Sequence, residues 1–332
     1  MGLPVITKSN FSEVQAIYRS FLDRAGFTFP GPSTEADTKL YKLAIEESIR
    51  MGIPHPEHGI SAFAGDDIPD TNEHLSSQKK LKAYFGPILF SGVQITTTAY
   101  GHLDDNPHLQ MIVAIFTAFA IYMDEAHQLG ADAQEDVDRF QERFLSGERH
   151  TDPVLQAGDV LLKELYQCFG RIQANCIIAA ALNMSTSVIL EATEIEVTEP
   201  SYAEFYRRMS GVTDAYSFFV FPSNRSINLS DFIQTVPEIG VFLNHTNDIL
   251  SFYKEEKAGE DVNYISLLAK SQGISKIDSL RLAVEKVIVA HENIIRVLGC
   301  NQEALDCYRS FSQGYMAYHV YGERYKLNEL GF

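Results

Sequence analysis

The sequence contains no tryptophan, and its four cysteines form no metal-binding or redox pattern. None of them forms a C-x-x-C pair, and no group of cysteine and histidine residues has the spacing of a zinc site. We therefore expect reduced, buried thiols rather than disulfides at Cys168, Cys176, Cys300 and Cys307.

Basic residues are also scarce. The chain has 27 Lys and Arg residues against 44 Asp and Glu residues, a formal net charge of -17. A nucleic-acid-binding protein would show a basic face, so this class of partner is not expected. A phosphate ligand is still compatible with the charge, because bound metal cations invert the local electrostatics and carboxylates recruit them. With 45% hydrophobic and 21% charged residues, the chain has the composition of a folded protein.

No segment resembles a signal peptide or a membrane span. Residues 1–6 lack a charged region followed by an apolar run. The longest apolar stretch, residues 111–123, is interrupted by Thr117 and is shorter than the ~20 residues that span a bilayer. We interpret it as a core helix. These features predict a soluble, cytoplasmic protein with no membrane partner.

Strand-like alternation, a Gly-rich phosphate loop, a G-x-S-x-G elbow, internal repeats and low-complexity linkers are all absent from the sequence. Apolar residues instead follow helical spacing, and glycines and prolines between residues 51 and 71 predict a loop. The sequence therefore predicts one all-α domain over residues 1–332, with helices around a central cavity. The expected helices cover residues 11–22, 40–49, 77–100, 107–129, 132–146, 153–184, 201–220, 230–257, 261–271, 276–298 and 301–329.

One helical segment, residues 247–255 (NDILSFYKE), carries three oxygen ligands in a row. Asn247, Ser251 and Glu255 are four residues apart, so each step turns by only about 40° and all three share one helix face. Such ligands suit a divalent cation such as Mg²⁺, which shares its coordination shell with waters and phosphate. Lys254 adds a positive charge beside this face. The pattern indicates a metal–diphosphate site, and the alternative is an ordinary amphipathic helix with a polar side.

The same segment resembles the N-D-x-x-S-x-x-x-E motif of class I terpene cyclases. Its longer form, N-D-I-L-S-F-Y-K-E, is similar to that of the trichodiene synthase family of fungi. The resemblance covers most of the chain after about residue 75 and is stronger at the motifs than between them. It implies the class I terpene synthase (isoprenoid synthase) fold, a helical barrel around an active-site cavity.

This family has an aspartate-rich motif upstream, and Asp124 and Glu125 stand at the corresponding position, where the apolar stretch ends. The resemblance implies that Asp124 binds metal and that Glu125 is either a further ligand or a hydrogen-bonding residue. Gln128 replaces the final acid and departs from the family pattern. A literal D-D-x-x-D string at residues 66–70 is a weaker candidate, because Pro69 breaks any helix there. Residues 104–107 are interpreted as a helix boundary.

The resemblance also implies a basic clamp for a diphosphate group. The family's diphosphate-sensing arginine corresponds to Arg207, and its C-terminal Arg-Tyr pair corresponds to Arg324 and Tyr325. Together with Lys254, they would stabilise the charge that accumulates on the leaving group. Aromatic side chains suit the lining of a cavity that holds a carbocation. The candidates are Phe90, Tyr100, Tyr122, Phe219, Phe242 and Tyr315, although aromatic residues at helical spacing are more often plain core.

Taken together, the resemblance implies a Mg²⁺-dependent sesquiterpene cyclase, a carbon–oxygen lyase that uses three Mg²⁺ ions to ionise farnesyl diphosphate. C10 and C20 diphosphates stay open as substrates, as does a homodimer, and the product is not specified. A chain-elongating isoprenyl transferase would need two aspartate-rich motifs. A non-catalytic isoprenoid-binding protein is a second alternative, encouraged by Gln128. A hydrolase using His55 and His58 is remoter, because that pair lies among prolines without ligand partners.

Overall fold

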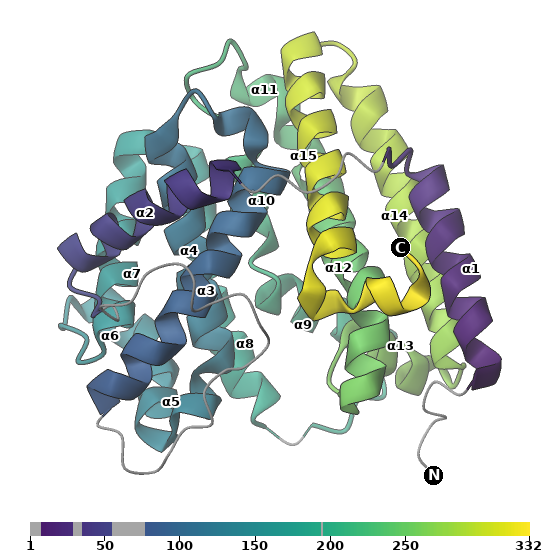
Figure 1. Ribbon diagram of the computed structural model, residues 1–332, viewed down its shortest axis with the longest axis horizontal. Coiled ribbons are helices and arrows are strands. Elements are labelled where there is room, and N and C mark those ends of the chain that lie inside the picture. The colour runs from purple at the N-terminus through teal and green to yellow at the C-terminus, as the bar shows by residue number, and fades with distance from the viewer. Residues whose placement is uncertain (1–7, 29–34, 55–76, 194) are drawn as a thin grey trace. The chain divides into compact units, whose positions relative to one another are not determined.

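The computed structural model describes residues 8–28, 35–54, 77–193 and 195–332 (Figure 1). Every regular element within these ranges is a helix, which confirms the all-α prediction. The chain divides into two compact units. Unit 1 comprises Met1–Pro32 and Glu191–Phe332, and unit 2 comprises Ser33–Leu190. A single domain over the whole chain stays a prediction.

Unit 2 is built around an apolar helix, α4. Pro107 occupies its first turn, and the Asn106 side chain accepts a hydrogen bond from the Leu109 N–H at 3.1 Å. This confirms the predicted helix boundary. Helix α3 lies very close to α4, because a Cβ at Gly92 would come within 2.3 Å of the Ala114 carbonyl oxygen. The elements of unit 2 are α2 (Glu35–Arg50), α3 (Ser77–Ala99), η2 (Gly101–Leu103), α4 (Pro107–Glu125), η3 (Ala126–Leu129), α5 (Ala131–Asp138), α6 (Phe140–Ser146), α7 (Pro153–Cys168) and α8 (Arg171–Glu191).

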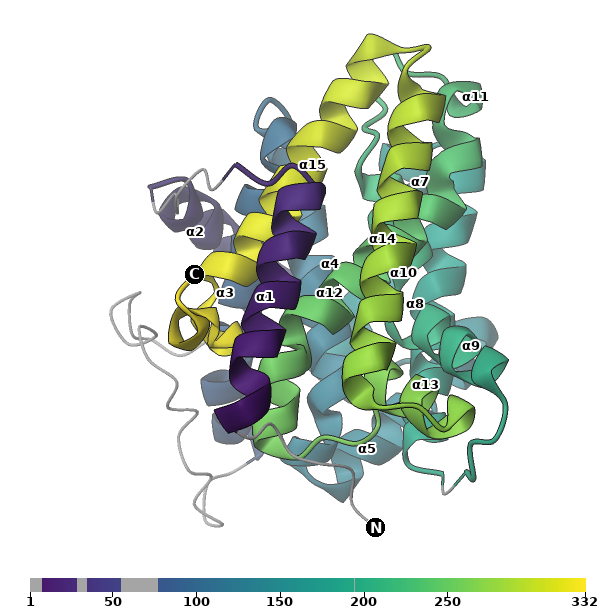
Figure 2. The same ribbon diagram turned by 90° about the vertical axis from the view of Figure 1, so that its right-hand side faces the viewer.

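Unit 1 is built around α12, which contacts α1, α9, α10, α13, α14, α15 and η5. Figure 2 shows α1 and α14 side by side, with α12 behind them. The elements of unit 1 are α1 (Lys8–Arg24), α9 (Pro200–Ser210), α10 (Thr213–Phe219), α11 (Leu229–Phe232), η4 (Ile233–Thr235), α12 (Val236–Ala258), α13 (Tyr264–Gln272), α14 (Lys276–Leu298), α15 (Gln302–Tyr321), η5 (Glu323–Tyr325) and η6 (Leu327–Leu330).

Six predicted helices are interrupted or shorter than the sequence pattern suggested. The segment 107–129 ends as an α-helix at Glu125 and continues as η3, and the segment 230–257 divides into α11, η4 and α12. The segment 153–184 is interrupted at Phe169, which is extended, and 301–329 is interrupted at Gly322, which is also extended. The segment 132–146 divides at Arg139. The segment 201–220 divides at residues 211–212, where Val212 takes the left-handed conformation at φ 48°. Apolar periodicity continues through each break, so the sequence pattern did not reveal them.

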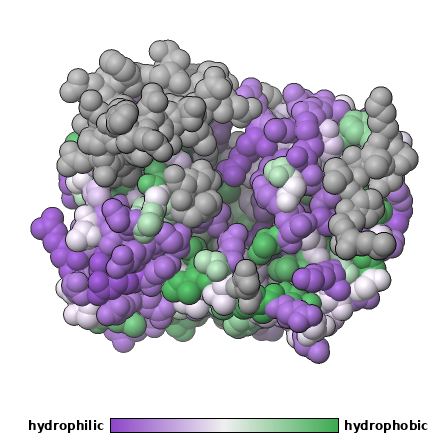
Figure 3. Space-filling view, turned by 90° about the horizontal axis from the view of Figure 1, so that it is seen from below, coloured by the Kyte–Doolittle hydropathy of each residue, from purple (hydrophilic) through white to green (hydrophobic). Residues whose placement is uncertain are grey.

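Two helices, α4 and α8, are long and apolar enough to cross a membrane by length and composition alone. Most of α4 is buried in unit 2, which is how a core helix of a folded domain also behaves; less than half of α8 is buried. The apolar stretch at residues 111–123 lies within α4, which extends beyond it at both ends, so the whole helix reaches the length that the stretch alone does not. On the face drawn in Figure 3, hydrophilic residues cover much of the described surface. All four cysteines are free thiols, as predicted, but only Cys307 is buried. Cys168 and Cys176 are partly exposed and Cys300 is exposed, so the predicted burial was wrong for these three.

Candidate active site

The three candidate metal ligands of α12 lie in unit 1. They differ in the hydrogen-bond and ion-pair partners that their side chains have. Ser251 is 1% exposed, and no described residue lies in hydrogen-bonding geometry with its Oγ. Burial raises the pKa of the Glu255 carboxyl, while Lys254 and the nearby Ser251 hydroxyl act in the opposite direction. Lys254 Nζ is 3.8 Å from Glu255 Oε1. The Ser251 hydroxyl therefore lacks a hydrogen-bond partner, and the Glu255 carboxylate has Lys254 as its cation at 3.8 Å.

These residues fit a divalent cation. In the part of the chain that the structure describes, no three His, Cys, Asp or Glu side chains come together as a metal site. The candidate ligands on α12 do not form such a cluster, because two of the three metal-ligating groups are the Asn247 amide and the Ser251 hydroxyl. Mg²⁺ is usually bound by one or two carboxylates together with waters and phosphate oxygens. The unpartnered Ser251 Oγ and the Glu255 carboxyl are oxygen donors of this type.

Arg207 of α9 lies against the start of this face. Its Nε donates to Asp248 Oδ1 at 2.7 Å, and its Nη2 donates to Asn247 Oδ1 at 2.9 Å and to the Asn244 carbonyl oxygen at 3.2 Å. Burial alone would lower the pKa of the guanidinium, but Asp248 raises it above its ordinary value. The predicted sensor arginine and the first predicted metal ligand are therefore in direct contact.

Gly211 permits this contact. A Cβ there would lie 2.1 Å from Asn244 Oδ1 and 2.8 Å from an Arg207 guanidinium nitrogen. The end of α9 can approach α12 only because this position has no side chain. The next residue, Val212, then takes its left-handed conformation and starts α10 in a new direction. The break between α9 and α10 thus places Arg207.

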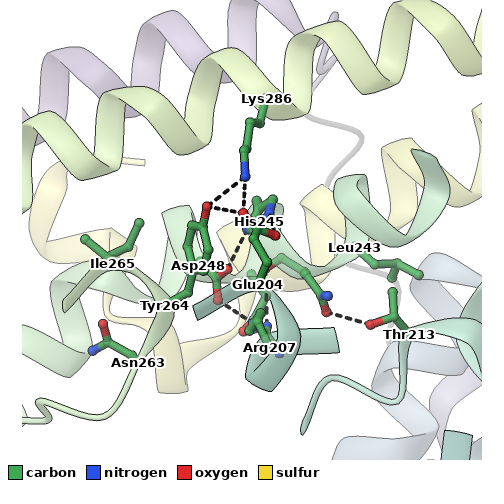
Figure 4. A network of polar contacts seen from close by, with 12 residues as sticks. Glu204, Arg207, Thr213, Leu243, His245, Asp248, Asn263, Tyr264, Ile265 and Lys286 are labelled. Atoms are coloured by element: carbon green, nitrogen blue, oxygen red, sulfur yellow. Dashed lines mark hydrogen bonds and ion pairs between the residues drawn. The ribbon is translucent and has the colours of Figure 1, made fainter. Parts of the chain in front are cut away.

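A buried chain of ionisable groups extends from Arg207 toward the surface (Figure 4). His245 Nδ1 donates to Asp248 Oδ2 at 2.9 Å, and its Nε2 lies 3.4 Å from Glu204 Oε2. Burial would lower the pKa of His245, but the two carboxylates raise it. Burial would likewise raise the pKa of Glu204, yet His245 and Lys286 hold it well below its usual range. Glu204 and Arg207 on α9 therefore contact His245 and Asp248 on α12 as two matching pairs.

Glu204 has two further partners at the outer end of this chain. The Tyr264 hydroxyl donates to Glu204 Oε1 at 2.5 Å, and Lys286 of α14 also contacts Glu204. Sequence analysis missed Glu204, His245 and Lys286. A signal was present, since residues 204 and 207 and residues 245 and 248 share the i, i+3 spacing that places two side chains on one helix face.

Asn247 also contacts α15 on its other side. Its Nδ2 is 3.1 Å from His319 Nε2, and His319 Nδ1 is 2.8 Å from the Tyr315 carbonyl oxygen. Burial lowers the pKa of His319 to about 3, so the imidazole is neutral. His319 was not predicted, because its partner Asn247 lies 72 residues away in the sequence.

The predicted Arg324-Tyr325 pair forms η5, which contacts α12. The Tyr325 ring is buried 4.4 Å from the His319 ring, measured between centroids. The exposed Arg324 guanidinium carbon lies 5.7 Å from the centroid of the Tyr325 ring. Unit 1 therefore brings together the ligands of α12, Arg207 and the Arg-Tyr element.

The predicted acids of unit 2 lie at the end of α4. Asp124 is exposed, and Glu125 accepts a hydrogen bond from the Tyr84 hydroxyl at 2.6 Å. This contact agrees with the hydrogen-bonding role considered for Glu125, and its binding of metal stays a prediction. Gln128 lies in η3, and its side chain is outside the described residues, as are the 66–70 string, His55 and His58.

Most of the predicted aromatic lining residues are packed within their own unit. In unit 2, Tyr122 is 1% exposed and its hydroxyl donates to Asp152 Oδ2 at 2.5 Å, and the Phe90 ring packs edge-on against Tyr41. In unit 1, Phe242 lies among the rings of α14 and α15. Their contact with a substrate stays a prediction, as it does for Tyr100, Phe219, Phe242 and Tyr315, which are all buried.

Comparison with known proteins gives a consistent result. Residues 89–331 match the family described as Trichodiene synthase (TRI5). Alpha-cuprenene synthase COP6 of Coprinopsis cinerea is 32% identical, over 98% of this chain and 92% of its own length. Longiborneol synthase CLM1 of Gibberella zeae is 34% identical, over 67% of this chain and 68% of its own length.

Solved structures show the fold. A linalool/nerolidol synthase from Streptomyces clavuligerus, crystallised with 2-fluorogeranyl diphosphate, superimposes with a TM-score of 0.60 at 11% identity. The match covers 89% of this chain and 99% of that one. This likeness confirms the class I terpene synthase fold predicted from the sequence. The family match across residues 89–331 and the relatives at 32% and 34% identity establish that the chain belongs to the trichodiene synthase family of fungal terpene synthases.

Proposed function

We propose that this protein is a Mg²⁺-dependent sesquiterpene cyclase that ionises farnesyl diphosphate and closes the resulting carbocation into a ring. The observation that carries the proposal is the α12 face, where Ser251 Oγ is buried without a partner among the described residues and Arg207 contacts Asn247. An unpartnered buried hydroxyl costs stability, and a bound cation would satisfy it. A farnesyl substrate is proposed because members of this family mostly use it.

Asn247, Ser251 and Glu255 would hold Mg²⁺ on α12 of unit 1, and Asp124 of α4 stays the proposed Mg²⁺ ligand of unit 2. When bound, Mg²⁺ supplies positive charge that stabilises the departing diphosphate. Arg207, Lys254, Arg324 and Tyr325 would bind diphosphate oxygens. Charge-assisted hydrogen bonds from these donors would strengthen as the C–O bond breaks and negative charge grows on the leaving group. The bonding electrons leave with the diphosphate, and the carbon left behind is an allylic cation.

The experiment incubates purified protein with farnesyl diphosphate and Mg²⁺ and analyses the extract by gas chromatography–mass spectrometry. The proposal expects a cyclic C15 hydrocarbon or alcohol that is absent when Mg²⁺ is chelated. Parallel incubations with geranyl and geranylgeranyl diphosphate test the substrate length. If only geranyl or only geranylgeranyl diphosphate gives a product, the proposal of a terpene cyclase stands and the proposed farnesyl substrate is wrong.

A non-catalytic isoprenoid-binding protein is the second candidate, and Gln128 in place of the family's last acid favours it. The two candidates differ in one measurement. A binding protein would take up diphosphate in a Mg²⁺-dependent manner, as seen by calorimetry, and would form no volatile product from any of the three substrates. We propose the cytosol as the compartment of the reaction and leave the oligomeric state to solution scattering.

A further inference from the structure

The Asn247 side chain amide lies between a group that can only donate and a group that can only accept. Arg207 has no acceptor, so the amide oxygen Oδ1 must face it, as the 2.9 Å contact from Nη2 shows. The amide nitrogen Nδ2 then faces His319 Nε2 at 3.1 Å. The contact with Arg207 thus determines the orientation of the amide, and the contact with His319 is consistent with it.

The acceptor role of His319 follows from its other nitrogen. Nδ1 lies 2.8 Å from the Tyr315 carbonyl oxygen, which can only accept a hydrogen bond, so Nδ1 carries the proton. Nε2 faces the N–H group of Asn247, so it must be the unprotonated nitrogen. The contacts therefore assign one tautomer of a neutral imidazole.

The position of this imidazole is fixed on all sides. His319 is fully buried, and its ring packs against Tyr315 and Tyr325 at centroid distances of 4.6 and 4.4 Å. One helical turn away, the Tyr315 hydroxyl donates to the Leu243 carbonyl oxygen at 3.1 Å. Helices α12 and α15 are thus joined at two successive turns, residues 243 and 315 and then Asn247 and His319.

An amide has nearly the same shape after a 180° rotation, but the rotation exchanges an oxygen for an NH₂ group. Only the oxygen can bind a metal ion. Arg207 favours the correct orientation in the ligand-free chain, but in the proposed function it turns to the diphosphate. His319 has no proposed role in binding diphosphate, so its contact with the Asn247 amide would persist when the substrate is bound.

We infer that His319 is a positioning residue that holds the Asn247 amide with its oxygen toward the metal. This inference rests on the proposed function. His319 does not contact the reacting atoms; it acts through Asn247. Its removal would leave the amide able to present its NH₂ group to the cation, with a loss of metal affinity and only a secondary effect on folding.

The test compares two replacements of His319 with a control of the same chemistry. His319→Phe keeps a planar ring and removes the acceptor, whereas His319→Gln supplies an oxygen acceptor. The control is His291→Phe, at a half-buried histidine outside the candidate site, whose Nδ1 contacts the Tyr308 hydroxyl at 2.8 Å. The probe is Mn²⁺ with inorganic diphosphate, and its binding is followed by electron paramagnetic resonance, with thermal melting of each apo protein beside it.

We expect His319→Phe to weaken Mn²⁺ binding 10- to 100-fold, the usual effect of removing a partner that orients a metal ligand. His319→Gln should recover most of this loss, and His291→Phe should bind as the wild type does, whatever its melting temperature. Wild-type affinity in His319→Phe would overturn the inference. Equal losses in the Phe and Gln variants would also overturn it, because ring packing would then explain both.

The wild-type protein supplies a measurement that needs no variant. Nitrogen-15 spectra of the His319 imidazole should show a protonated Nδ1 and an unprotonated Nε2, and the opposite tautomer would overturn the inference. If the wild type binds no Mn²⁺ with diphosphate, the proposed function fails, whereas the spectrum still decides whether His319 orients Asn247.

Discussion

Arg207 and Asp248 form an ion pair in the interior of unit 1, with Nε 2.7 Å from Oδ1 and with side chains 14% and 6% exposed. The pair joins α9 to α12 next to Asn247. Because His245 donates to the second carboxylate oxygen, Asp248 holds two partners at once, Arg207 and His245. The position of the proposed sensor arginine therefore depends on a residue that is itself held by a network reaching Glu204.

Replacing Asp248 by alanine should destabilise the protein by about 3 to 5 kcal/mol, because it leaves the buried Arg207 guanidinium without its counterion. Urea unfolding followed by circular dichroism measures the change. The matched control is Asp261→Ala, which removes an 86% exposed carboxylate 3.4 Å from Lys276. A surface contact of this kind contributes about 0 to 1 kcal/mol. Equal losses in both variants would contradict the structural importance of the Arg207–Asp248 pair.

Gly211→Ala should lower stability and raise the KM for farnesyl diphosphate, because the new Cβ collides with Asn244 and displaces Arg207. Overpacking of this kind typically costs about 1 to 3 kcal/mol. Gly101→Ala is the control, since a Cβ there meets nothing within 4 Å. We expect its stability to stay within about 0.5 kcal/mol of wild type and its kinetics to be unchanged. A Gly211→Ala variant with wild-type KM would show that Arg207 tolerates displacement.

Ser251→Ala should change the stability of the metal-free protein by no more than about 1 kcal/mol, because the buried hydroxyl has no partner in hydrogen-bonding geometry and its one stabilising effect is on the Glu255 carboxyl. Turnover and Mg²⁺ affinity should fall at the same time. Ser266→Ala removes another buried hydroxyl that has no partner among the described residues, on α13. It should share the effect on melting temperature and keep full turnover. Equal turnover and Mg²⁺ affinity in the two variants would contradict the assignment of Ser251 as a metal ligand.

His291 should make the protein less stable in mild acid. Burial, followed by the charge of Arg309, lowers its pKa in the folded protein to about 4, against an ordinary value of 6.5. Between these values the unfolded chain binds the proton and the folded chain does not, so unfolding is favoured as the pH falls from 6.5 toward 4. The stability is fully present above 6.5, and one histidine can remove up to about 1.4 kcal/mol per pH unit.

Urea unfolding at pH 7.5, 6 and 5 measures this slope. We expect a shallower slope for His291→Gln, in which no imidazole is left to protonate. Tyr308→Phe should keep the wild-type slope, because it removes the hydroxyl partner but not the titrating ring. A His291→Gln protein with an unchanged slope would place the acid sensitivity elsewhere, for example at His319, whose pKa is lowered to about 3 by burial.

Asp124→Ala and Asn247→Ala should each lower turnover at least as much as the 10- to 100-fold losses seen when residues that merely orient metal ligands are removed. The fold should stay intact, since Asp124 is exposed and Asn247 is only half-buried. Steady-state turnover at ordinary Mg²⁺ and thermal melting are the measurements. Asp132→Ala, an exposed acid on α5, is the control. Normal turnover by either Asp124→Ala or Asn247→Ala would contradict the assignment of that residue as a Mg²⁺ ligand.

The sequence predicted the elements that depend on local pattern. Helix α12 follows from its periodicity, and Asn247, Ser251 and Glu255 follow from fixed four-residue spacing, which the helix conserves in space. Arg207 was predicted to serve the same site, and its contact with Asn247 brings the two together. Metal binding at these positions stays a prediction that the experiments above address.

What could not be predicted depends on contacts between distant segments. The partnership of His319 with Asn247 spans 72 residues, and that of Glu204 with His245 spans 41. Periodicity also gave no warning of the break at Val212, because a left-handed valine is stabilised by its surroundings rather than by its own preference. The aromatic residues show a similar limit, since one apolar pattern fits both a packed core and a cavity wall.

Helix α12 contacts elements from both ends of the chain, α1 near the N-terminus and α15 near the C-terminus. A substitution that shifts α12 would therefore disturb several helices together. The relative positions of Asn247, Ser251 and Glu255 are thus a property of the packing of unit 1 as a whole and not of one helix alone.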